Sequence, residues 1–409
     1  MRARGLSSTE CSEMVRKSRT ATGPGARQAP SSRPTIKDVA KRCGVHPSTV
    51  SRALSPATSH LVATDVAKRI RAAAVALGYQ PNVTAAGLRT GRSGLIGVLA
   101  PDIADPGFPP ILSGITETLD DEGYATIVVD IGPDRSRQQQ LVDRLIARGV
   151  DGLVLATATL GDPVIGHCIA ASIPVVLLNR ADAGRRLSAV VTDDETGMWL
   201  AVDHLGTLGH RRIGHIAGPQ DVSTGVLRRA GFKTAAAAAG VPSRSTMIET
   251  TRAYTREEGR LAALRLLGRK VAPTAIVAAN DLLALGIYDA LRKSGLNCPR
   301  DLSVVGHNDM PYVDMLSPPL TTVRIAQRNM GNQAARLLLD EIANPAARRE
   351  RIVLEPSLIV RASTAPPKTR AGAVSERGAG RNCSASTNSK RCVPSQYDRN
   401  VSPRGRLSE

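Results

Sequence analysis

Residues 35–54 have the sequence TIKDVAKRCGVHPSTVSRAL, and this stretch predicts two short helices on either side of a glycine turn. Thr35 and Asp38 have the spacing of a capping box at a helix N-terminus. Gly44 supplies the left-handed residue with which helices commonly end, and Pro47 stands in the first turn of the next helix, where its missing N–H costs nothing. The stretch therefore predicts a helix-turn-helix that presents its second helix to the major groove of DNA.

The second helix, residues 47–54, separates apolar from polar side chains. Val50 and Leu54 are expected to face inward together with Val45, whereas Ser48, Thr49, Ser51 and Arg52 face outward. Ser48, Thr49 and Arg52 are the side chains expected to reach base edges. The full set of residues predicted to contact DNA in this region is Thr35, Lys37, Pro47, Ser48, Thr49, Ser51 and Arg52.

Positive charge is concentrated toward the ends of the chain. The 409 residues carry a net charge of +18, and residues 33–92 alone hold ten lysines and arginines against two acidic residues. Residues 1–32 and 366–409 are also basic, whereas residues 93–365 are balanced. A basic region attached to a neutral body is typical of a DNA-binding protein with a separate sensing domain.

The helix-turn-helix resembles the DNA-binding headpiece of the LacI/GalR family of bacterial transcriptional regulators. The likeness is carried by TIKDVA, GV and TVSR at fixed spacing, and the chain departs from the family pattern at Cys43, His46 and Ser55. The resemblance implies a homodimer that binds a roughly palindromic double-stranded operator, most often as a repressor.

Residues 81–92 follow a predicted third helix and resemble the hinge helix of this family. The resemblance implies that Asn82 caps the hinge helix and that Leu88 inserts into the minor groove as a wedge. An ordinary linker is the alternative interpretation. Gly87 lowers the helix propensity by up to about 1 kcal/mol, so we expect the hinge to form only with DNA and a partner hinge present.

From Gly94 onward, short apolar runs alternate with amphipathic stretches. Such alternation predicts parallel sheets that are covered on both faces. One set of runs lies at 95–101, 126–131, 152–157 and 174–179, and a second at 212–218, 275–280 and 302–307. Two sets of about a hundred residues each predict two doubly wound lobes with a cleft between them. This region resembles the family's effector domain, which is similar to periplasmic sugar-binding proteins.

The expected fold is an all-α headpiece followed by an α/β periplasmic-binding-protein-like domain of two parallel-sheet lobes. Its parts are a disordered basic extension (1–33), the headpiece (34–80), the hinge helix or linker (81–92), a two-lobed ligand-sensing and dimerisation domain (93–365) and a disordered basic tail (366–409). A start codon assigned too far upstream, with Met14 or a later residue as the true start, is the alternative for the first segment.

Polar side chains that follow the strands of both lobes are the candidate ligand contacts. Ligands of open α/β sheets bind beyond the carboxyl ends of the strands. The resemblance assigns an arginine at the position of Arg228 and an aromatic cover at Tyr254 to the ligand. The predicted ligand-binding residues are Asp105, Phe108, Asn179, Arg180, Asp193, Arg228, Tyr254, Asn280 and Asn308. Asp194, Asp281 and Asp309 are expected to be caps or structural residues.

Arginine, carboxylate, amide and aromatic groups together suit a sugar or another polyhydroxylated metabolite. Many sugar-responsive relatives carry aspartate at the position of Asn308, so this residue leaves the ligand's identity open. We expect no metal, no cofactor and no catalytic residue, because the six cysteines lack metal-ligand spacing and no catalytic constellation stands out.

With no signal-peptide core and no run of eighteen apolar residues, the expected location is the cytoplasm, at the nucleoid, with no membrane partner. A regulator without a small effector, an activator, and a cytoplasmic sugar-binding or sugar-modifying protein remain alternatives.

Overall fold

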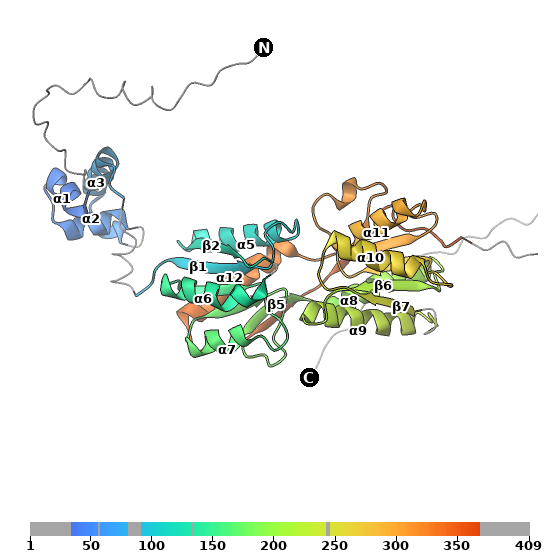
Figure 1. Ribbon diagram of the computed structural model, residues 1–409. Helices are drawn as coiled ribbons and strands as arrows, with labels where there is room; N and C mark the ends of the chain where they lie inside the picture. The colour runs from blue at the N-terminus through green and yellow to red at the C-terminus, as the bar shows by residue number, and fades with distance from the viewer. Residues whose placement is uncertain (1–33, 56–57, 81–90, 133, 243–245, 369–409) are drawn as a thin grey trace, which may run out of the picture. The chain divides into compact units, whose positions relative to one another are not determined.

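In the computed structural model the described residues are 34–55, 58–80, 91–132, 134–242 and 246–368 (Figure 1). The headpiece contains three α-helices and a short 3-10 turn. They are α1 (Ile36–Cys43), α2 (Pro47–Leu54), η1 (Ser59–Leu61) and α3 (Thr64–Leu77). The Asp38 carboxylate accepts hydrogen bonds from the Thr35 backbone N–H at 2.8 Å and from its hydroxyl at 2.7 Å. Gly44 ends α1 with φ 62, so the helix-turn-helix predicted from the sequence is confirmed.

The core of the headpiece is small and built largely from alanine. Val39, Val50 and Ile70 are fully buried, one from each of the three α-helices. Ala40, Ala53, Ala67, Ala73, Ala74 and Cys43 complete the cluster. Because most of these side chains are small, Ile70 provides a large share of the apolar contact that holds the three helices together.

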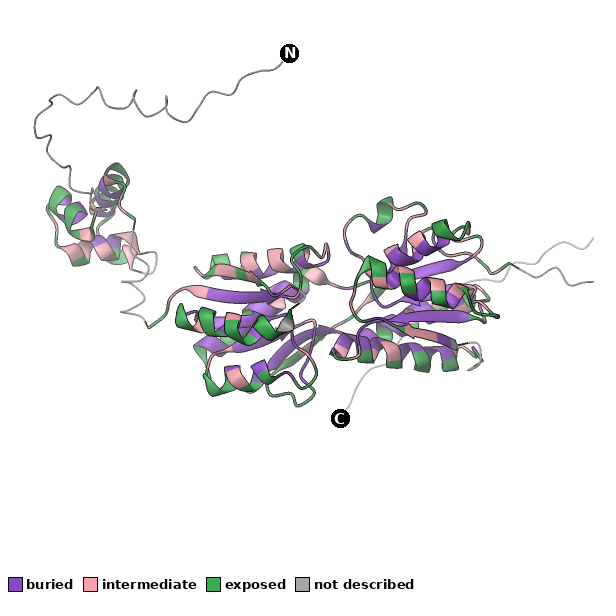
Figure 2. Cartoon of the chain, viewed as in Figure 1, coloured by how far each residue is buried: buried purple, intermediate pink, exposed green. Residues whose placement is uncertain are grey.

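The first lobe is a parallel sheet covered on both faces. Its strands are β1 (Leu95–Ala100), β2 (Ala125–Asp130), β3 (Gly152–Leu155), β4 (Val175–Leu178), β5 (Ser188–Thr192) and β11 (Arg351–Leu354), in the order β11-β5-β4-β3-β1-β2. One face packs on α5 (Phe108–Asp121) and α12 (Gln327–Ala343), and the other on α6 (Gln138–Ala147) and α7 (Pro163–Ala170). Figure 2 shows the strands buried between half-exposed helices.

The second lobe repeats this plan. Its strands are β6 (Ile213–Ala217), β7 (Thr246–Thr250), β8 (Ala275–Ala278), β9 (Ser303–Asn308), β10 (Thr321–Arg324) and β12 (Ser357–Ile359), in the order β12-β10-β9-β8-β6-β7. All neighbours are parallel except β10 and β12. One face packs on α8 (Asp194–Thr207) and α9 (Ser223–Ala238), the other on α10 (Arg256–Leu267) and α11 (Asp281–Lys293).

The chain passes between the lobes three times. It leaves the first lobe after β5, returns from β10 to α12 and β11, and ends in the second lobe at β12. The expectation of two consecutive sets of about a hundred residues was therefore wrong for residues 327–354, which complete the first lobe. Strands β5, β7, β10, β11 and β12 were also not predicted from the sequence.

Candidate functional site

The second headpiece helix, α2, presents polar side chains to solvent. Ser48 and Arg52 are exposed, whereas Pro47, Thr49 and Ser51 are partly buried. The His46 ring caps the helix: its Nδ1 accepts from the Ser48 backbone N–H at 3.2 Å and lies 2.8 Å from the Ser48 hydroxyl. The departure from the family pattern at His46 therefore preserves the helix start and orients Ser48.

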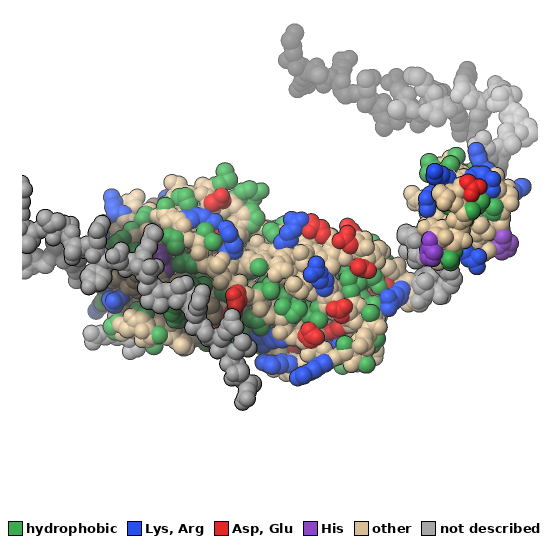
Figure 3. Space-filling view, turned by 180° about the vertical axis from the view of Figure 1, so that it is seen from behind, with side chains coloured by type: hydrophobic (Ala, Val, Ile, Leu, Met, Phe, Trp, Pro, Cys, Tyr) green, Lys and Arg blue, Asp and Glu red, His purple; other side chains and the backbone are tan. Residues whose placement is uncertain are grey.

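Basic residues surround this helix-turn-helix. Thr35 and Lys37 at the start of α1 are exposed, as are Lys41 and Arg42 in its last turn. Figure 3 shows the headpiece surface with several basic side chains and little acidic surface on the face in view. Asn82 and Leu88, the predicted hinge contacts, lie outside the described residues.

One pocket in the body is lined by loops that follow strands of both lobes. Eight of the nine side chains predicted to bind ligand line it: Asp105, Phe108, Asn179, Arg180, Arg228, Tyr254, Asn280 and Asn308. Two hydrogen bonds connect the lobes nearby: the Ala181 N–H donates to the Ser223 hydroxyl at 3.0 Å, and the Leu160 N–H donates to the Asp221 carbonyl at 2.8 Å. The carboxyl ends of the parallel strands converge here, as this fold requires.

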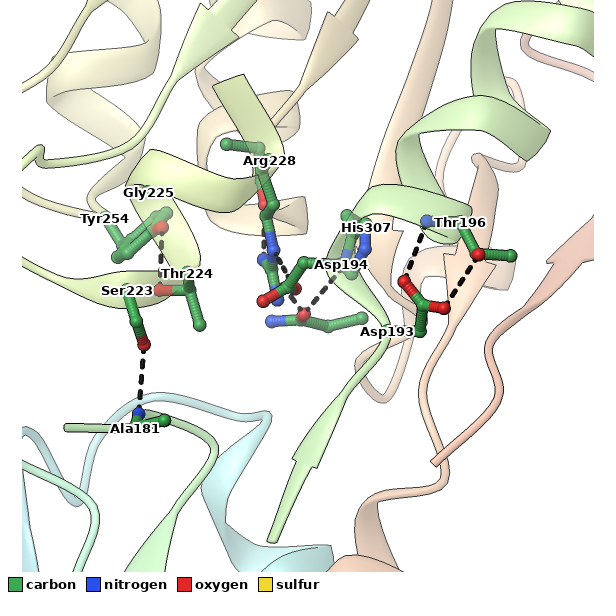
Figure 4. Close-up of polar contacts among 12 residues, drawn as sticks. Ala181, Asp193, Asp194, Thr196, Ser223, Thr224, Gly225, Arg228, Tyr254 and His307 are labelled. Atoms are coloured by element: carbon green, nitrogen blue, oxygen red, sulfur yellow. Dashed lines mark hydrogen bonds and ion pairs between the residues drawn. The ribbon is translucent and has the colours of Figure 1, made fainter. Parts of the chain in front are cut away.

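Asp193 is the exception among the predicted residues. Its carboxylate accepts from the Thr196 N–H at 3.0 Å and the Thr196 hydroxyl at 2.8 Å, so it caps α8, and it is not among the residues that line the pocket (Figure 4). A carboxylate at this position satisfies N–H groups that the first helical turn leaves without partners. The structure thus gives Asp193 a capping role, and its contact with a ligand stays a prediction.

Arg228 lies at the centre of the second-lobe wall. Its Nε donates to Asp194 Oδ1 at 2.7 Å, and Nη1 donates to the Ala279 carbonyl at 2.5 Å and to Asn308 Oδ1 at 3.4 Å. Both side chains of the Arg228–Asp194 ion pair are 3% exposed. Burial alone would lower the pKa of Arg228, but the facing Asp194 carboxylate and Tyr254 raise it, so the guanidinium stays charged.

Tyr254 and Thr224 form a second polar contact in the wall. The two hydroxyls lie 3.2 Å apart, and Figure 4 shows the ring beside the start of α9. Gly218 leaves room for the ring, because a Cβ at this glycine would come within 2.3 Å of the Tyr254 ring carbon that bears the hydroxyl. A glycine is therefore required next to the aromatic side chain of the pocket.

The first-lobe wall combines oxygen acceptors with the guanidinium of Arg180. Asp105 Oδ1 accepts from the Gly107 N–H at 2.8 Å, and burial raises the pKa of this carboxyl. Asn179 has a positive φ of 60, and its Oδ1 is buried without a hydrogen-bond partner among the described residues. Arg180 is buried and donates to the Thr157 carbonyl at 3.3 Å. A buried acceptor beside the pocket is a feature that a ligand donor would satisfy.

Sequence reasoning missed several residues of the pocket. Asp102 and Thr224 lie within a few residues of predicted contacts. Ile325 and Gln327 enter the pocket from the β10–α12 crossover, and Gln327 Nε2 is buried without a partner among the described residues. The apolar runs did not indicate this crossover. They predict where strands and helices lie along the chain, but not which lobe α12 packs against.

Asp194, Asp281 and Asp309 have the structural contacts expected of them. Asp309 pairs with Arg324 and Arg361, each at 2.7 Å. Asp281 accepts from the Thr322 hydroxyl at 2.6 Å and the Met310 N–H at 2.8 Å. These aspartates hold the loops that carry the pocket residues.

Asp281 should make the stability of the second lobe depend on pH. Burial raises the pKa of this carboxyl from its ordinary 3.8 to about 7, despite hydrogen bonds that lower it. The unfolded chain loses the proton first, so stability falls as pH rises between about 4 and 7 and is flat above that, by up to about 4 kcal/mol. Asp281→Asn should flatten this part of the curve when unfolding free energy is measured against pH. An unchanged slope in the variant would rule out Asp281 as its source.

Among the described residues, no group of three or more His, Cys, Asp or Glu side chains is placed to hold a metal ion. No helix in the same part of the chain is both long and apolar enough to cross a membrane.

Two family models match the chain. The model described as bacterial regulatory proteins, lacI family, matches residues 35–82, and the periplasmic binding protein-like domain matches residues 202–364. The HTH-type transcriptional regulator reg1 of Streptomyces lividans is 35% identical over 339 residues, which are 81% of this chain and 96% of the relative.

Two solved structures are similar over both regions. The complex of the transcriptional regulator CelR with cellobiose is 31% identical, with a TM-score of 0.63 over 81% of this chain and all of that one. The lac repressor dimer bound to operator and the anti-inducer ONPF is 28% identical, with a TM-score of 0.72 over 82% of this chain and all of that one. With its helix-turn-helix headpiece and two-lobed body, this chain belongs to the LacI family of bacterial transcriptional regulators.

Proposed function

We propose that this regulator is a repressor whose affinity for a palindromic operator is controlled by a small polyhydroxylated ligand held between the two lobes. The observation that carries the proposal is the pocket in which Arg228, Tyr254, Asn280 and Asn308 of one lobe face Asp105 and Asn179 of the other. A ligand that contacts both walls favours one arrangement of the lobes, and an effector shifts an equilibrium only by its differential affinity for two states.

Exposed polar residues of the headpiece support direct reading of DNA. Ser48 and Arg52 stand one helical turn apart on α2 and are both exposed, so they lie on one face of the helix. Thr35 and Lys37 at the start of α1 are exposed, which supports a role in phosphate contacts that position the headpiece on the duplex. DNA as the partner also implies action in the bacterial cytoplasm.

Exposed apolar side chains support a homodimer. Strand β2 is an edge of the first sheet and leaves Val128 exposed, and Tyr312 and Met315 are exposed in the loop around η4 (Val313–Met315) of the second lobe. Exposed apolar residues on an open sheet edge are typical of contact surfaces. The related lac repressor structure is a dimer on its operator, and a dimer of this chain would present two headpieces to two half-sites.

Replacing Arg52 with alanine should weaken operator binding by about 1–3 kcal/mol and relax base preference at one position of each half-site. Lys37→Ala, by contrast, should weaken binding to all sequences alike and lower its dependence on salt. Fluorescence anisotropy with the selected operator and its single-base variants measures both effects. Equal losses on every base for Arg52→Ala would place Arg52 on the phosphate backbone instead.

The proposal is tested with purified full-length protein in two steps. Operators are first selected from random duplexes at physiological salt, and sugars, sugar acids and nucleosides are then screened for changes in operator affinity. Equal binding to selected and random duplexes would contradict the DNA-reading role. If selection succeeds but no compound changes operator affinity, the ligand-controlled role is wrong and a regulator without a small effector is the better description.

A further inference from the structure

Asn308 sits in an unusual backbone conformation at the end of β9. Its φ of 111 lies in the region that favours glycine, and the next residue, Asp309, also has a positive φ of 52. Asp309 is held there by two ion pairs, to Arg324 and Arg361. A non-glycine residue stays in such a conformation only when its surroundings determine it, so the position of the Asn308 side chain is fixed.

The orientation of the Asn308 amide follows from its neighbours. Arg228 Nη1 can only donate, so the amide atom 3.4 Å away must be the oxygen. His307 Nδ1 lies 3.1 Å from the same oxygen and must therefore carry its proton. Burial lowers the pKa of His307 well below its ordinary value, which agrees with a neutral ring. The Asn308 oxygen is thus occupied by two protein donors, and the Nδ2 group is left for the pocket.

The Asn280 amide has the same orientation, with its oxygen bound by the protein and its NH2 group free for the pocket. Its Oδ1 accepts from the Leu283 N–H at 2.9 Å as the cap of α11, so this amide too offers its N–H groups to the pocket. Arg228 adds a guanidinium that is paired with the Asp194 carboxylate, and no acidic residue of the second lobe is among the described residues that line the pocket. This wall therefore donates hydrogen bonds at three positions.

The opposite wall carries carboxylates beside donors from Arg180 and Gln327, and one Arg180 donor is already taken by the Thr157 carbonyl. Asp102 and Asp105 both line the pocket from the first lobe, and Asn179 Oδ1 is a buried acceptor without a partner among the described residues. A hydroxyl that faced Arg228, Asn280 and Asn308 could only accept from these groups, as a carboxylate does, whereas a carboxylate beside Asp102 and Asp105 would meet like charge. Hydroxyls are suited to the first-lobe wall and a carboxylate to the second.

We infer that the effector is a sugar acid, an aldonate or uronate, with its carboxylate on Arg228, Asn280 and Asn308 and its hydroxyls toward Asp102 and Asp105. The inference rests on the proposed function and narrows its ligand class. His307 acts as a positioning residue, because it holds the amide of Asn308 in the donor orientation.

The test titrates full-length protein calorimetrically with D-gluconate, D-glucuronate and D-galacturonate, and with the neutral partners D-glucose and D-galactose. At least one acid should bind ten-fold or more tightly than its neutral partner. Asn308→Asp keeps the shape but places a carboxylate against the ligand's carboxylate, so it should reduce binding of that acid at least ten-fold and lower the ratio of acid to neutral-sugar affinity.

His307 variants test the positioning role. His307→Asn keeps a donor near the place of Nδ1 and should retain the preference for the acid, whereas His307→Leu should lose most of it. Thermal unfolding and operator binding without ligand report whether each variant is folded. The ratio of acid affinity to neutral-sugar affinity then separates a positioning role from a general loss of binding.

Two results would overturn the inference and are distinguishable from failure of the proposed function. A neutral sugar that binds as tightly as its acid and changes operator affinity would overturn the sugar-acid assignment and leave ligand control intact. If none of the three acids binds, the sugar-acid assignment is wrong as well. Only if no compound of the wider screen alters operator affinity does ligand control itself fail.

Discussion

Arg228→Ala is expected to abolish the response of operator binding to the effector and to destabilise the second lobe by about 3–5 kcal/mol. The substitution removes the guanidinium that faces the pocket and leaves the Asp194 carboxylate, which is 3% exposed, without its cation. It also removes the donors to the Ala279 carbonyl and the Asn308 oxygen. Denaturant unfolding, followed by fluorescence of the single tryptophan, Trp199 in α8, measures the loss of stability.

A double variant separates the two effects. Arg228→Ala combined with Asp194→Ala removes the buried charge as well, so stability should largely recover while ligand binding remains absent. Arg328→Ala is the control, since Arg328 and Glu117 are 62% and 51% exposed in their ion pair and the substitution should change stability by less than about 1 kcal/mol. A normal effector response in Arg228→Ala would show that this arginine serves only the fold.

Ile70→Ala is expected to abolish operator binding by unfolding the headpiece while the body continues to bind effector. Ile70 is fully buried in a core made mostly of alanines, and deletion of such a side chain costs about 2–5 kcal/mol. A domain of fewer than fifty residues has little stability to lose. Operator titration and calorimetric effector titration of the same full-length variant measure the two activities separately.

Val75→Ala is the control on the same helix. Val75 is 82% exposed in α3, so its truncation should leave both activities unchanged. If Ile70→Ala still binds operator with wild-type affinity, the headpiece does not depend on this core.

Much of the fold could be predicted because its signals are local. Thr35 caps the start of the first helix, Gly44 ends it, and Pro47 begins the second. Each acts through the backbone of its near neighbours in the sequence. The long buried strands of both lobes follow from apolar runs. The return of residues 327–354 to the first lobe could not be predicted in this way, because a crossover depends on which face α12 covers and not on its own periodicity.

Pocket residues could be predicted from the sequence where they stand at the end of a recognisable strand. Asn179 and Asn280 follow buried strands and Asn308 ends one, and the structure brings all three to one pocket. Asp193 was assigned to the ligand and Asp194 to the fold, but the two are adjacent at the start of α8, and only the helix rotation decides which one caps and which one meets Arg228. Gln327 depended on the unpredicted crossover.

The amide orientation of Asn308 was also beyond sequence reasoning. It depends on Arg228 and His307 approaching the same oxygen, and these two residues come from different elements. Asparagine alone offers both a donor and an acceptor. Only the contacts around it determine which one the ligand meets.

Ligand control of operator binding is tested most directly by a reciprocal titration of the wild-type protein. Operator affinity is measured with and without saturating effector, and effector affinity is measured with and without saturating operator. Linkage requires the two ratios to be equal, and coupling of about 1–3 kcal/mol corresponds to a change of roughly 5- to 150-fold in each. We predict equal ratios within this range. An operator affinity that stays the same at saturating effector would contradict the assignment of this pocket as the control site of a DNA-binding regulator.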